Sequence, residues 1–441
     1  MVFLSALAGD PHKCAPSIHI AGSKGKGSVT GMLCAILTEA GFHPARYMSP
    51  HVIDIRERIC LGDKYFDEET YRAAGDEARR VAEELLPAAG NPLFATSTDE
   101  SEPTYWELLT LLFFLCARLA RCDVMVTETG MGGRLDSTNI LDPLASVITL
   151  IEIEHANILG DTITAIAGEK AGIIKQGKPL VLARQSGEVF EVFRKKAEEK
   201  NSRLYYLPDI ADISNVKISV HGTEFSLSIA NSSILLPHSS FSIPVPGKVQ
   251  AENAALAIAA VKIAFPQIGI NTIRRGLKNL KIPARFENIA LPGMPPFIVD
   301  GAHTPESLSL CIETFCFLYS EGGILIFGCA ADKDAAAMAR IAHSHFSRII
   351  VTTPGTFKSS NPSLVYETFV RETGREKTTL IENTQEAVKL AENMAVGNST
   401  ITSRKDAENE REKTALPVLG TGSFYLVSEI RKILLKNTAT L

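Results

Sequence analysis

The sequence contains no apolar run long enough to cross a membrane. The longest, LLTLLFFLCA from Leu108, is about half of the roughly twenty residues that a span requires. The eight cysteines include no C-x-x-C pair, which excludes the common zinc and redox patterns and favours free thiols in a reducing compartment. The opening stretch, MVFLSALAGD, lacks the basic residues of a secretion signal. We therefore expect a cytoplasmic protein.

An excess of positive charge is also missing. Lysine and arginine total 45 against 50 acidic residues, a net charge of -5, so no global basic field draws the chain to nucleic acid or to an anionic membrane. We expect neither as a partner, and any bound phosphate must meet a local site. Apolar residues at 45% and charged residues at 22% are typical of globular proteins and exclude disorder. A length of 441 residues predicts two or three domains.

Short apolar runs alternate with helical stretches from Ser17 to about Arg285, a pattern that predicts a mostly parallel, P-loop-type α/β sheet. Between about Asn215 and Pro246 the period becomes two, which indicates a small antiparallel excursion. Four later runs predict strands of a second, smaller α/β domain: PPFIVD, GGILIFG, SRIIVTT and FYLVSE. We divide the chain into domains 1–285 and 286–441, with a hinge at Ile282-Pro283-Ala284. The charged segment 398–413 is interpreted as a solvated loop.

The strongest chemical signal is the string IHIAGSKGKGS, residues 18–28, in which a buried strand enters a glycine-rich turn and then a helix. Backbone N–H groups in such a turn cradle phosphates, with Lys26 as the cation and Ser28 as a hydroxyl ligand for Mg²⁺. Gly27 stands between these two residues, unlike the usual order. A glycine-rich turn alone is often only a tight turn, but the lysine and the hydroxyl together favour a nucleotide site.

Three further polar residues are candidates for a chemical role, and two of them close apolar runs. Glu128 ends the run CDVMVT at the carboxyl end of a predicted core strand, where either a Mg²⁺ ligand or a capping or ion-paired carboxylate fits. His155 closes the segment EIEH, and a lone histidine there is more often a hydrogen-bonded structural residue than a metal ligand. Lys170 follows Glu169, and the simplest interpretation of that neighbouring pair is a surface ion pair.

The second half of the chain adds polar groups around the hinge. Asn253 lies in GKVQAEN, which opens a predicted helix, and Arg285 lies at the hinge itself. Asp300 and His303 close the strand PFIV in the string DGAH. These positions fit together if ATP is held between the two α/β domains.

Taken together, the motifs resemble the folylpolyglutamate synthase and dihydrofolate synthase family of the Mur-ligase superfamily. The resemblance covers about residues 4–427 and is carried, in the family's order and spacing, by GSKGKGS, YMSPH with RERI, ETGMGGRLDSTN, EHANILGDTITAIAGEKAGIIKQGKP, GKVQAEN, PARFE, DGAH and FGCAADKD. It implies an ATP-dependent ligase that joins L-glutamate to folate, and also to dihydropteroate in bifunctional members, through an acyl phosphate. ATP and two Mg²⁺ ions are the implied cofactors, and a monomer is the implied state.

The resemblance also implies roles for individual residues. Catalytic roles fall to Lys26, to His155 and to Lys170, which matches a lysine that the family carbamylates. Nucleotide contacts are implied for Gly25, Lys26, Gly27, Ser28, Asn253, Arg285, Asp300 and His303. The implied metal ligands are Ser28, Ser49, Glu128, His155 and Lys170. The implied pterin-pocket residues are Thr104, Tyr105, Trp106, Glu107, Leu135, Asp136 and Ser137.

The sequence departs from the family pattern at three places. Glu154 replaces the usual Asp beside His155, and Thr304 replaces the usual Asn after DGAH. Only about twenty residues precede the glycine-rich loop, where relatives commonly carry a helix and a pterin-contacting loop. From that we expect tetrahydrofolate-type acceptors to be used and dihydropteroate to bind more weakly. Two alternatives remain: another Mur-type amino-acid ligase, disfavoured by GGRLDSTN and EKAG, and a P-loop nucleotide switch, disfavoured by the lack of N-K-x-D.

Overall fold

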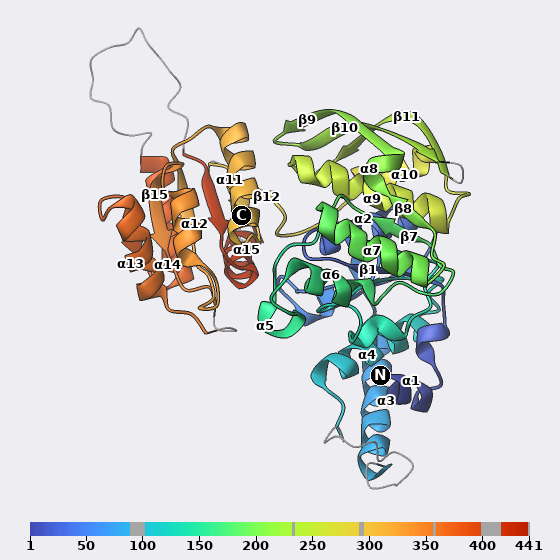
Figure 1. The fold of residues 1–441 in the computed structure, drawn as a ribbon. Coiled ribbons are helices and arrows are strands. Elements are labelled where there is room, and N and C mark those ends of the chain that lie inside the picture. Colours follow the sequence, from blue (N-terminus) through green and yellow to red (C-terminus); the bar gives the residue numbers. More distant parts are fainter. Residues whose placement is uncertain (89–101, 232–233, 291–294, 356–358, 398–415, 440–441) are drawn as a thin grey trace, which may run out of the picture.

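The computed structural model describes residues 1–88, 102–231, 234–290, 295–355, 359–397 and 416–439. The charged segment 398–413, for which we predicted a solvated loop, falls outside these residues. Within them the strands form three sheets, and the sheet of the last third of the chain stands beside the rest with its helix α11 (Pro305–Tyr319) facing across (Figure 1). The predicted α/β class, with an antiparallel excursion and a second α/β unit, is confirmed.

The largest sheet carries the glycine-rich loop. Its strands run in the order β4 (Lys64–Tyr65), β3 (Ile59–Leu61), β2 (Pro44–Tyr47), β5 (Val124–Glu128), β1 (Ser17–Ala21), β6 (Ala145–Ile148), β7 (Leu180–Leu182) and β8 (Leu204–Tyr206). The strands pair in parallel from β2 to β8, while β3 and β4 are antiparallel. Strand β1 is central and wholly buried, which explains its apolar character.

Helices cover both faces of this sheet. On one face, α2 (Lys26–Glu39) packs against α9 (Lys248–Ala264) and α10 (Ile270–Lys278), and the many alanines of α9 allow close approach. On the other, α4 (Tyr105–Leu119) packs with α3 (Glu68–Ala88). The remaining elements of this part are α1 (Val2–Leu7), α5 (Ala156–Leu159), α6 (Ile163–Ala171), α7 (Gly187–Glu199), α8 (Leu207–Ile210) and the 3-10 helices η1 (Pro11–Lys13), η2 (Ile55–Arg58) and η3 (Ser137–Ile140).

The segment before β1 does contain a helix. Helix α1 contacts α3, and the ammonium group of Met1 donates to the Glu107 carboxylate at 2.7 Å. The short segment before the glycine-rich loop therefore includes one helix of six residues.

The predicted antiparallel excursion is a three-stranded sheet, in the order β11 (Ile234–Ile243), β10 (Gly222–Asn231) and β9 (Ala211–Ser219). It packs on α9 through alternating side chains such as Phe225 and Leu227. This small sheet lies above α9 at the top of the view, and its strand β9 contributes one rim of the cleft described below (Figure 1).

The C-terminal sheet has the order β12 (Glu287–Ile289), β13 (Phe297–Val299), β17 (Val418–Thr421), β14 (Gly323–Phe327), β15 (Phe346–Val351) and β16 (Thr378–Leu380), parallel except for β12. Its other helices are α12 (Ala335–Ala342), α13 (Pro362–Thr373), α14 (Thr384–Gly397) and α15 (Phe424–Ala439). The prediction of a strand at FYLVSE is wrong: this run begins α15, and the strand is the preceding Val418–Thr421. A short apolar run does not distinguish a buried helix from a strand.

The described residues include no helix that combines the length and apolar character needed to cross a bilayer. All eight cysteines carry free thiols, and six of them are buried: Cys34, Cys60, Cys116, Cys122, Cys311 and Cys329. The prediction of free thiols is therefore confirmed.

Candidate active site

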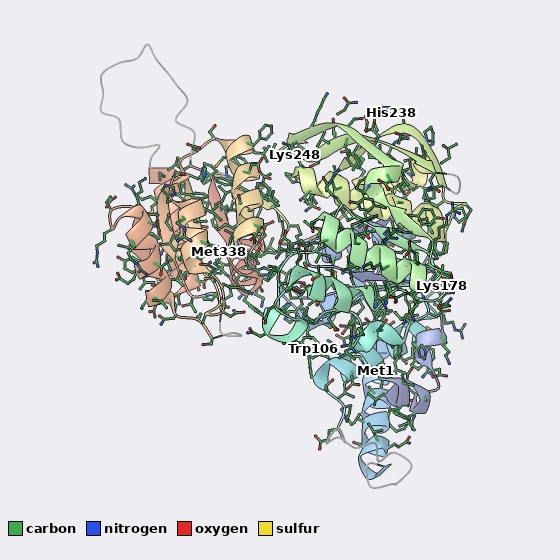
Figure 2. All side chains as sticks on the ribbon, in the orientation of Figure 1. Met1, Trp106, Lys178, His238, Lys248 and Met338 are labelled. Carbon is green, nitrogen blue, oxygen red and sulfur yellow. The ribbon has the colours of Figure 1, made fainter. Side chains whose placement is uncertain are left out.

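A cleft of about 760 Å³ lies where the two parts of the chain face each other. Its walls are the glycine-rich loop, the carboxyl ends of β5 and β6, the start of α9, the linker around Arg285 and the first turns of α11. Lys248, at the start of α9, marks the side that faces the C-terminal sheet (Figure 2). The cleft brings together the predicted residues Gly25, Lys26, Gly27, Ser28, Ser49, Glu128, His155, Asn253, Arg285, Asp300 and His303. A volume of this size is typical of a nucleotide-sized ligand.

The glycine-rich loop is held in a conformation that needs its glycines. Gly25 has a φ of 89°, and a Cβ there would lie 2.5 Å from the Asn253 side-chain oxygen, so α9 closes tightly over the loop. Helix α2 begins at Lys26 with no acidic residue in its first turn, so its N-terminal N–H groups favour an anion. The Lys26 ammonium donates to the Gly22 carbonyl at 2.8 Å, at the base of the loop.

Glu128 is a buried carboxylate at the end of β5. It is 3% exposed, and its Oε2 accepts one long hydrogen bond, 3.4 Å, from the Ser49 backbone N–H. Burial raises the pKa of Glu128 to about 7, although Lys26 and Arg285 oppose the shift. No ion pair satisfies this carboxylate among the described residues. A buried oxygen ligand in the same cleft as the Ser28 hydroxyl suits a divalent cation, whose charge would hold the carboxylate ionised.

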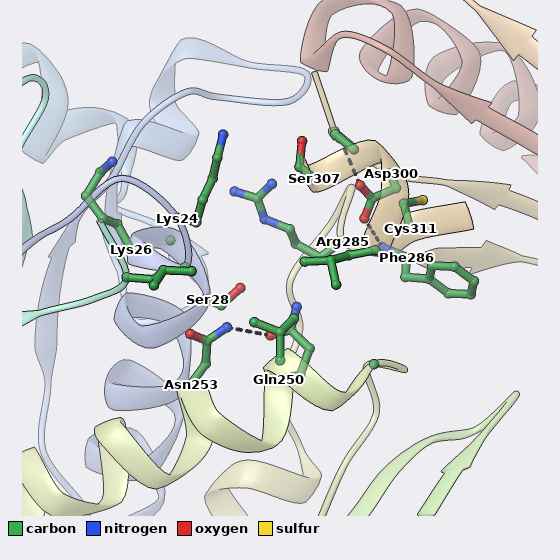
Figure 3. Close-up of a pocket in the computed structure, with 18 of the residues that line it drawn as sticks. Lys24, Lys26, Ser28, Gln250, Asn253, Arg285, Phe286, Asp300, Ser307 and Cys311 are labelled. Carbon is green, nitrogen blue, oxygen red and sulfur yellow. Dashed lines mark hydrogen bonds between the residues drawn. The ribbon is translucent and has the colours of Figure 1, made fainter. Parts of the chain in front are cut away.

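Residues of the linker and the C-terminal sheet form the opposite wall (Figure 3). The Arg285 guanidinium lies over the Phe424 ring, 4.5 Å from its centre. The Asp300 carboxylate accepts the Phe286 and Ala302 N–H groups, each at 2.8 Å. His303 Nδ1 lies 2.8 Å from the Gly301 carbonyl, and burial lowers the pKa of His303 to about 4. The histidine is therefore neutral at neutral pH.

Lys170 is buried behind the loop rather than in the cleft lining. Its side chain is 1% exposed, and its ammonium binds Glu154 at 2.8 Å and the Gly22 carbonyl at 2.9 Å. The simpler interpretation, a surface ion pair with Glu169, is wrong: Glu169 instead pairs with Arg134 at 2.9 Å. Burial lowers the pKa of Lys170 to about 8.

His155 lies next to this pair with an exposed side chain and a φ of 51°. The described part of the chain contains no group of three or more His, Cys, Asp or Glu side chains placed to hold a metal. As the side chains stand, the donor set of His155 and the Lys170 ammonium does not fit a cation, whereas that of Ser28, Ser49 and Glu128 does.

The residues predicted for the pterin pocket lie outside the cleft. Thr104 and Glu107 cap the start of α4 reciprocally, and Asp136 caps η3. The Ser137 hydroxyl lies 2.6 Å from that of Thr110, which joins the two predicted segments. Tyr105, Trp106 and Leu135 are 59%, 50% and 78% exposed, so these segments present a partly apolar surface. Figure 2 labels Trp106, which lies in the first turn of α4.

Sequence reasoning missed three residues of these sites. Phe424 was placed in a strand, although it stacks on Arg285 and fills the space beside Gly301. Arg58 donates to His51 Nδ1 at 2.9 Å and lies over Trp106, 5.2 Å from the ring centre. Lys24 lines the cleft from within the loop. Lys24 and Arg58 carried a signal, since they stand inside the glycine-rich string and the motif RERI, whereas Phe424 carried none.

The comparisons with known proteins agree with this geometry. Residues 78–261 match the Mur ligase middle domain, and residues 284–402 match the Mur ligase, glutamate ligase domain. The fold and the cleft thus define an ATP-dependent, amide-forming ligase of the Mur type.

Individual relatives show which family of Mur-type ligases the chain belongs to. The chain is 32% identical over 440 residues to dihydrofolate synthase/folylpolyglutamate synthase of Bacillus subtilis, covering 97% of this chain and 93% of that protein. It is 31% identical to folylpolyglutamate synthase of Lacticaseibacillus casei, covering 99% and 93%. Folylpolyglutamate synthase of Mycobacterium tuberculosis, solved with ADP and AMPPCP, superposes with a TM-score of 0.85 at 26% identity, covering 98% of this chain and 94% of that one. The chain belongs to the folylpolyglutamate synthase/dihydrofolate synthase family.

Proposed function

We propose that this ligase uses ATP to join L-glutamate to the carboxylate of a folate, and also of dihydropteroate. The observation that carries the proposal is that the glycine-rich loop, Glu128 and Arg285 line the same cleft. A relative named for both activities matches 97% of this chain, and one named folylpolyglutamate synthase matches 99%. A similar structure, 27% identical with a TM-score of 0.79, is a complex of folylpolyglutamate synthase with AMPPCP and folate. The nucleotide-switch alternative has no support from these relatives.

In the proposed reaction the acceptor carboxylate attacks the γ-phosphate of ATP, giving an acyl phosphate and ADP. The amino group of L-glutamate then attacks the acyl carbon, and the tetrahedral intermediate expels phosphate. The loop N–H groups, Lys26 and Arg285 bind the phosphates and neutralise the charge that develops on them. Asn253, Asp300 and His303 shape the nucleotide site from α9 and the C-terminal sheet. A closed, dry cleft protects the acyl phosphate from hydrolysis.

We assign Mg²⁺ to the oxygen ligands Ser28, Ser49 and Glu128, which fit it because Glu128 is buried without an ion pair. A bound Mg²⁺ would neutralise phosphate charge during transfer. The chain's own contribution is to hold these oxygens at the N-terminus of α2, after β2 and at the end of β5.

For a second ion we propose that Lys170 is carbamylated and acts with His155. CO₂ reacts with a neutral amine, and a pKa of about 8 provides more neutral amine at neutral pH than an ordinary lysine has. The product carries a carboxylate-like group where the structure has an ammonium. Glu154 would then lose its partner and turn away from the new negative charge.

The acceptor is proposed to bind at the surface formed by Thr104, Tyr105, Trp106, Glu107, Leu135, Asp136 and Ser137. Exposed aromatic and apolar side chains there suit a flat heterocycle, and the Arg58 guanidinium over the Trp106 ring adds a cation.

We also propose the division into domains 1–285 and 286–441, since β12 begins at Glu287. A cytoplasmic monomer without nucleic-acid or membrane partners is our working assignment.

The direct test is ADP release by the purified chain with ATP, Mg²⁺ and L-glutamate, offering a reduced folate or dihydropteroate in turn. We expect release to require both the acceptor and L-glutamate, and the acceptor to gain the mass of one glutamyl residue. Release that needs neither would contradict the proposal. Ligation of another carboxylate, but of no pterin acceptor, would leave only the ligase chemistry.

A further inference from the structure

Lys24 lies within the glycine-rich loop, and three hydrogen bonds anchor the backbone at Ser23 and Lys24. The N–H groups of Ser23 and Lys24 donate to the Leu150 carbonyl at 2.9 and 3.1 Å. The Ser23 hydroxyl donates to the Glu152 carbonyl at 2.9 Å. The loop is therefore anchored to the segment that follows β6, and the direction in which the Lys24 side chain leaves it is set.

The Lys24 side chain extends into the cleft. In Figure 3 it points towards Arg285 and the C-terminal wall that carries Ser307, whereas Lys26 lies on the other side of the loop. Within the described residues the Lys24 ammonium makes no hydrogen bond and no ion pair of its own. Glu152 and Glu154 are near enough to act on its charge, but neither forms an ion pair with it, and Glu154 is already paired with Lys170 at 2.8 Å. A half-buried ammonium without a partner is typical of a site that binds an anion.

Two anions enter this cleft in the proposed reaction, the nucleotide and the incoming amino acid. The loop N–H groups and Lys26 lie at the N-terminus of α2, where the phosphates belong. The charges around Lys24 have both signs, because the Glu152 carboxylate interacts electrostatically with Lys24 and with the like-charged Glu306. Neighbouring carboxylates disfavour a polyphosphate but suit a zwitterion, which brings an ammonium group along with its carboxylates.

We propose that Lys24 binds a carboxylate of the incoming L-glutamate, on the side of the glycine-rich loop that faces His303 and Ser307. This rests on the ligase function proposed above and adds a residue to it. Lys24 thereby links the nucleotide loop to the amino-acid site, and its contact places the amine beside the wall of the C-terminal sheet. The charge-assisted contact contributes to binding of the amino acid and not to binding of the nucleotide.

The test is Lys24→Gln in the full chain. We expect the KM for L-glutamate to rise about 10- to 100-fold, while the Kd for AMPPCP stays within about twofold of wild type. Lys24→Arg should recover part of the loss because it keeps the charge. The control is Lys64→Gln, which removes the same charge from exposed β4, outside the cleft lining, and should leave both values unchanged.

Two analogues identify the carboxylate. 4-Aminobutanoate is L-glutamate without its α-carboxylate, and L-2-aminobutanoate is L-glutamate without its side-chain carboxylate. With the analogue that lacks the group bound by Lys24, kcat/KM should differ less than about threefold between wild type and Lys24→Gln. With the other, the loss should match that for L-glutamate.

Three results would overturn the assignment. An unchanged KM for L-glutamate would leave Lys24 without a role in binding it. An equal loss with both analogues would show a general effect of charge. A matching loss of AMPPCP affinity would make Lys24 a phosphate ligand. These are separate from failure of the proposed function, which would show in wild type as ADP release that does not depend on L-glutamate; in that case the Lys24 assignment falls with it.

Discussion

At the scale of single residues, Lys170 shows how burial changes the chemistry of a side chain. Its amine is fully enclosed, yet it contacts one carboxylate and one carbonyl beside the glycine-rich loop. An ammonium in that position repels a metal ion, whereas a carbamate would attract one. Carbamylation of this one amine would therefore change the position from one that repels a metal ion to one that binds it.

We predict that Lys170→Ala is inactive and that short carboxylic acids such as acetate or propionate partly restore ligation, because they replace the missing carbamate. The measurement is ADP release as a function of acid concentration, with circular dichroism to verify folding. Lys175→Ala is the matched control, since Lys175 is a partly buried lysine whose ammonium binds a carbonyl, that of Asn139, and this variant should stay active with or without the acid. A folded Lys170→Ala protein that no acid restores would contradict carbamylation.

His19, on the central strand β1, predicts a pH dependence of stability. It is fully buried, its Nε2 lies 2.8 Å from the Thr138 hydroxyl, and its Nδ1 has no partner among the described groups. Burial lowers the pKa of His19 from 6.5 to about 3. Below pH 6.5 the unfolded chain binds a proton that the folded chain excludes, so the stability contributed by neutral His19 falls as the pH falls towards 3.

We expect this group to cost about 2 kcal/mol of unfolding free energy between pH 6.5 and pH 4.5, because the slope reaches its full value of about 1.4 kcal/mol per pH unit only well below pH 6.5. The measurement is urea unfolding of wild type and His19→Gln at both pH values. The variant should lose less stability than wild type over this interval. Equal losses would show that His19 does not exclude a proton in the folded state.

At the scale of elements, the glycine-rich loop depends on a contact with a helix more than two hundred residues away in sequence. Gly25 and Gly41 have the same φ, 89°. A Cβ at Gly25 would meet the Asn253 oxygen at 2.5 Å, whereas one at Gly41 would meet no atom within 4 Å. An alanine at Gly41 therefore introduces backbone strain alone, whereas an alanine at Gly25 also pushes against Asn253 of α9.

We predict that Gly25→Ala and Gly41→Ala each lose about 1 kcal/mol of stability from the backbone strain alone. Only Gly25→Ala should also raise the KM for ATP, by roughly 10-fold or more, because α9 and the loop move apart. Thermal unfolding and steady-state kinetics measure the two effects. A similar KM for ATP in both variants would mean that Asn253 yields without disturbing the loop.

At the scale of the whole molecule, the cleft requires both parts of the chain. Helix α2 contributes the phosphate loop, and α11 contributes the facing wall. We predict that AMPPCP with Mg²⁺ slows amide hydrogen exchange in both α2 and α11, because a ligand that bridges them stabilises both against local opening. Helix α13 lies outside the cleft lining and should not change. Protection confined to α2 would mean that the nucleotide binds one part only.

Local patterns in the sequence determined the class of fold and most of the elements around the cleft. Buried apolar runs predicted β1, β5, β6 and β13, because a strand covered on both faces has only apolar neighbours. The glycine-rich turn predicted the phosphate loop, since glycine is needed where φ is positive. These features depend on residues close in sequence, and so the sequence alone carries them.

Only the tertiary structure decided which distant groups meet. Lys170 pairs with Glu154 rather than with its neighbour Glu169, because adjacent residues on a helix point in different directions while α6 faces the loop after β6. The run at Phe424 became a helix because β17 already occupies the place of the strand, and its ring then reached Arg285. Burial, pairing and pKa depend on neighbours that no local pattern specifies, and that is why these contacts emerged only when the chain was folded.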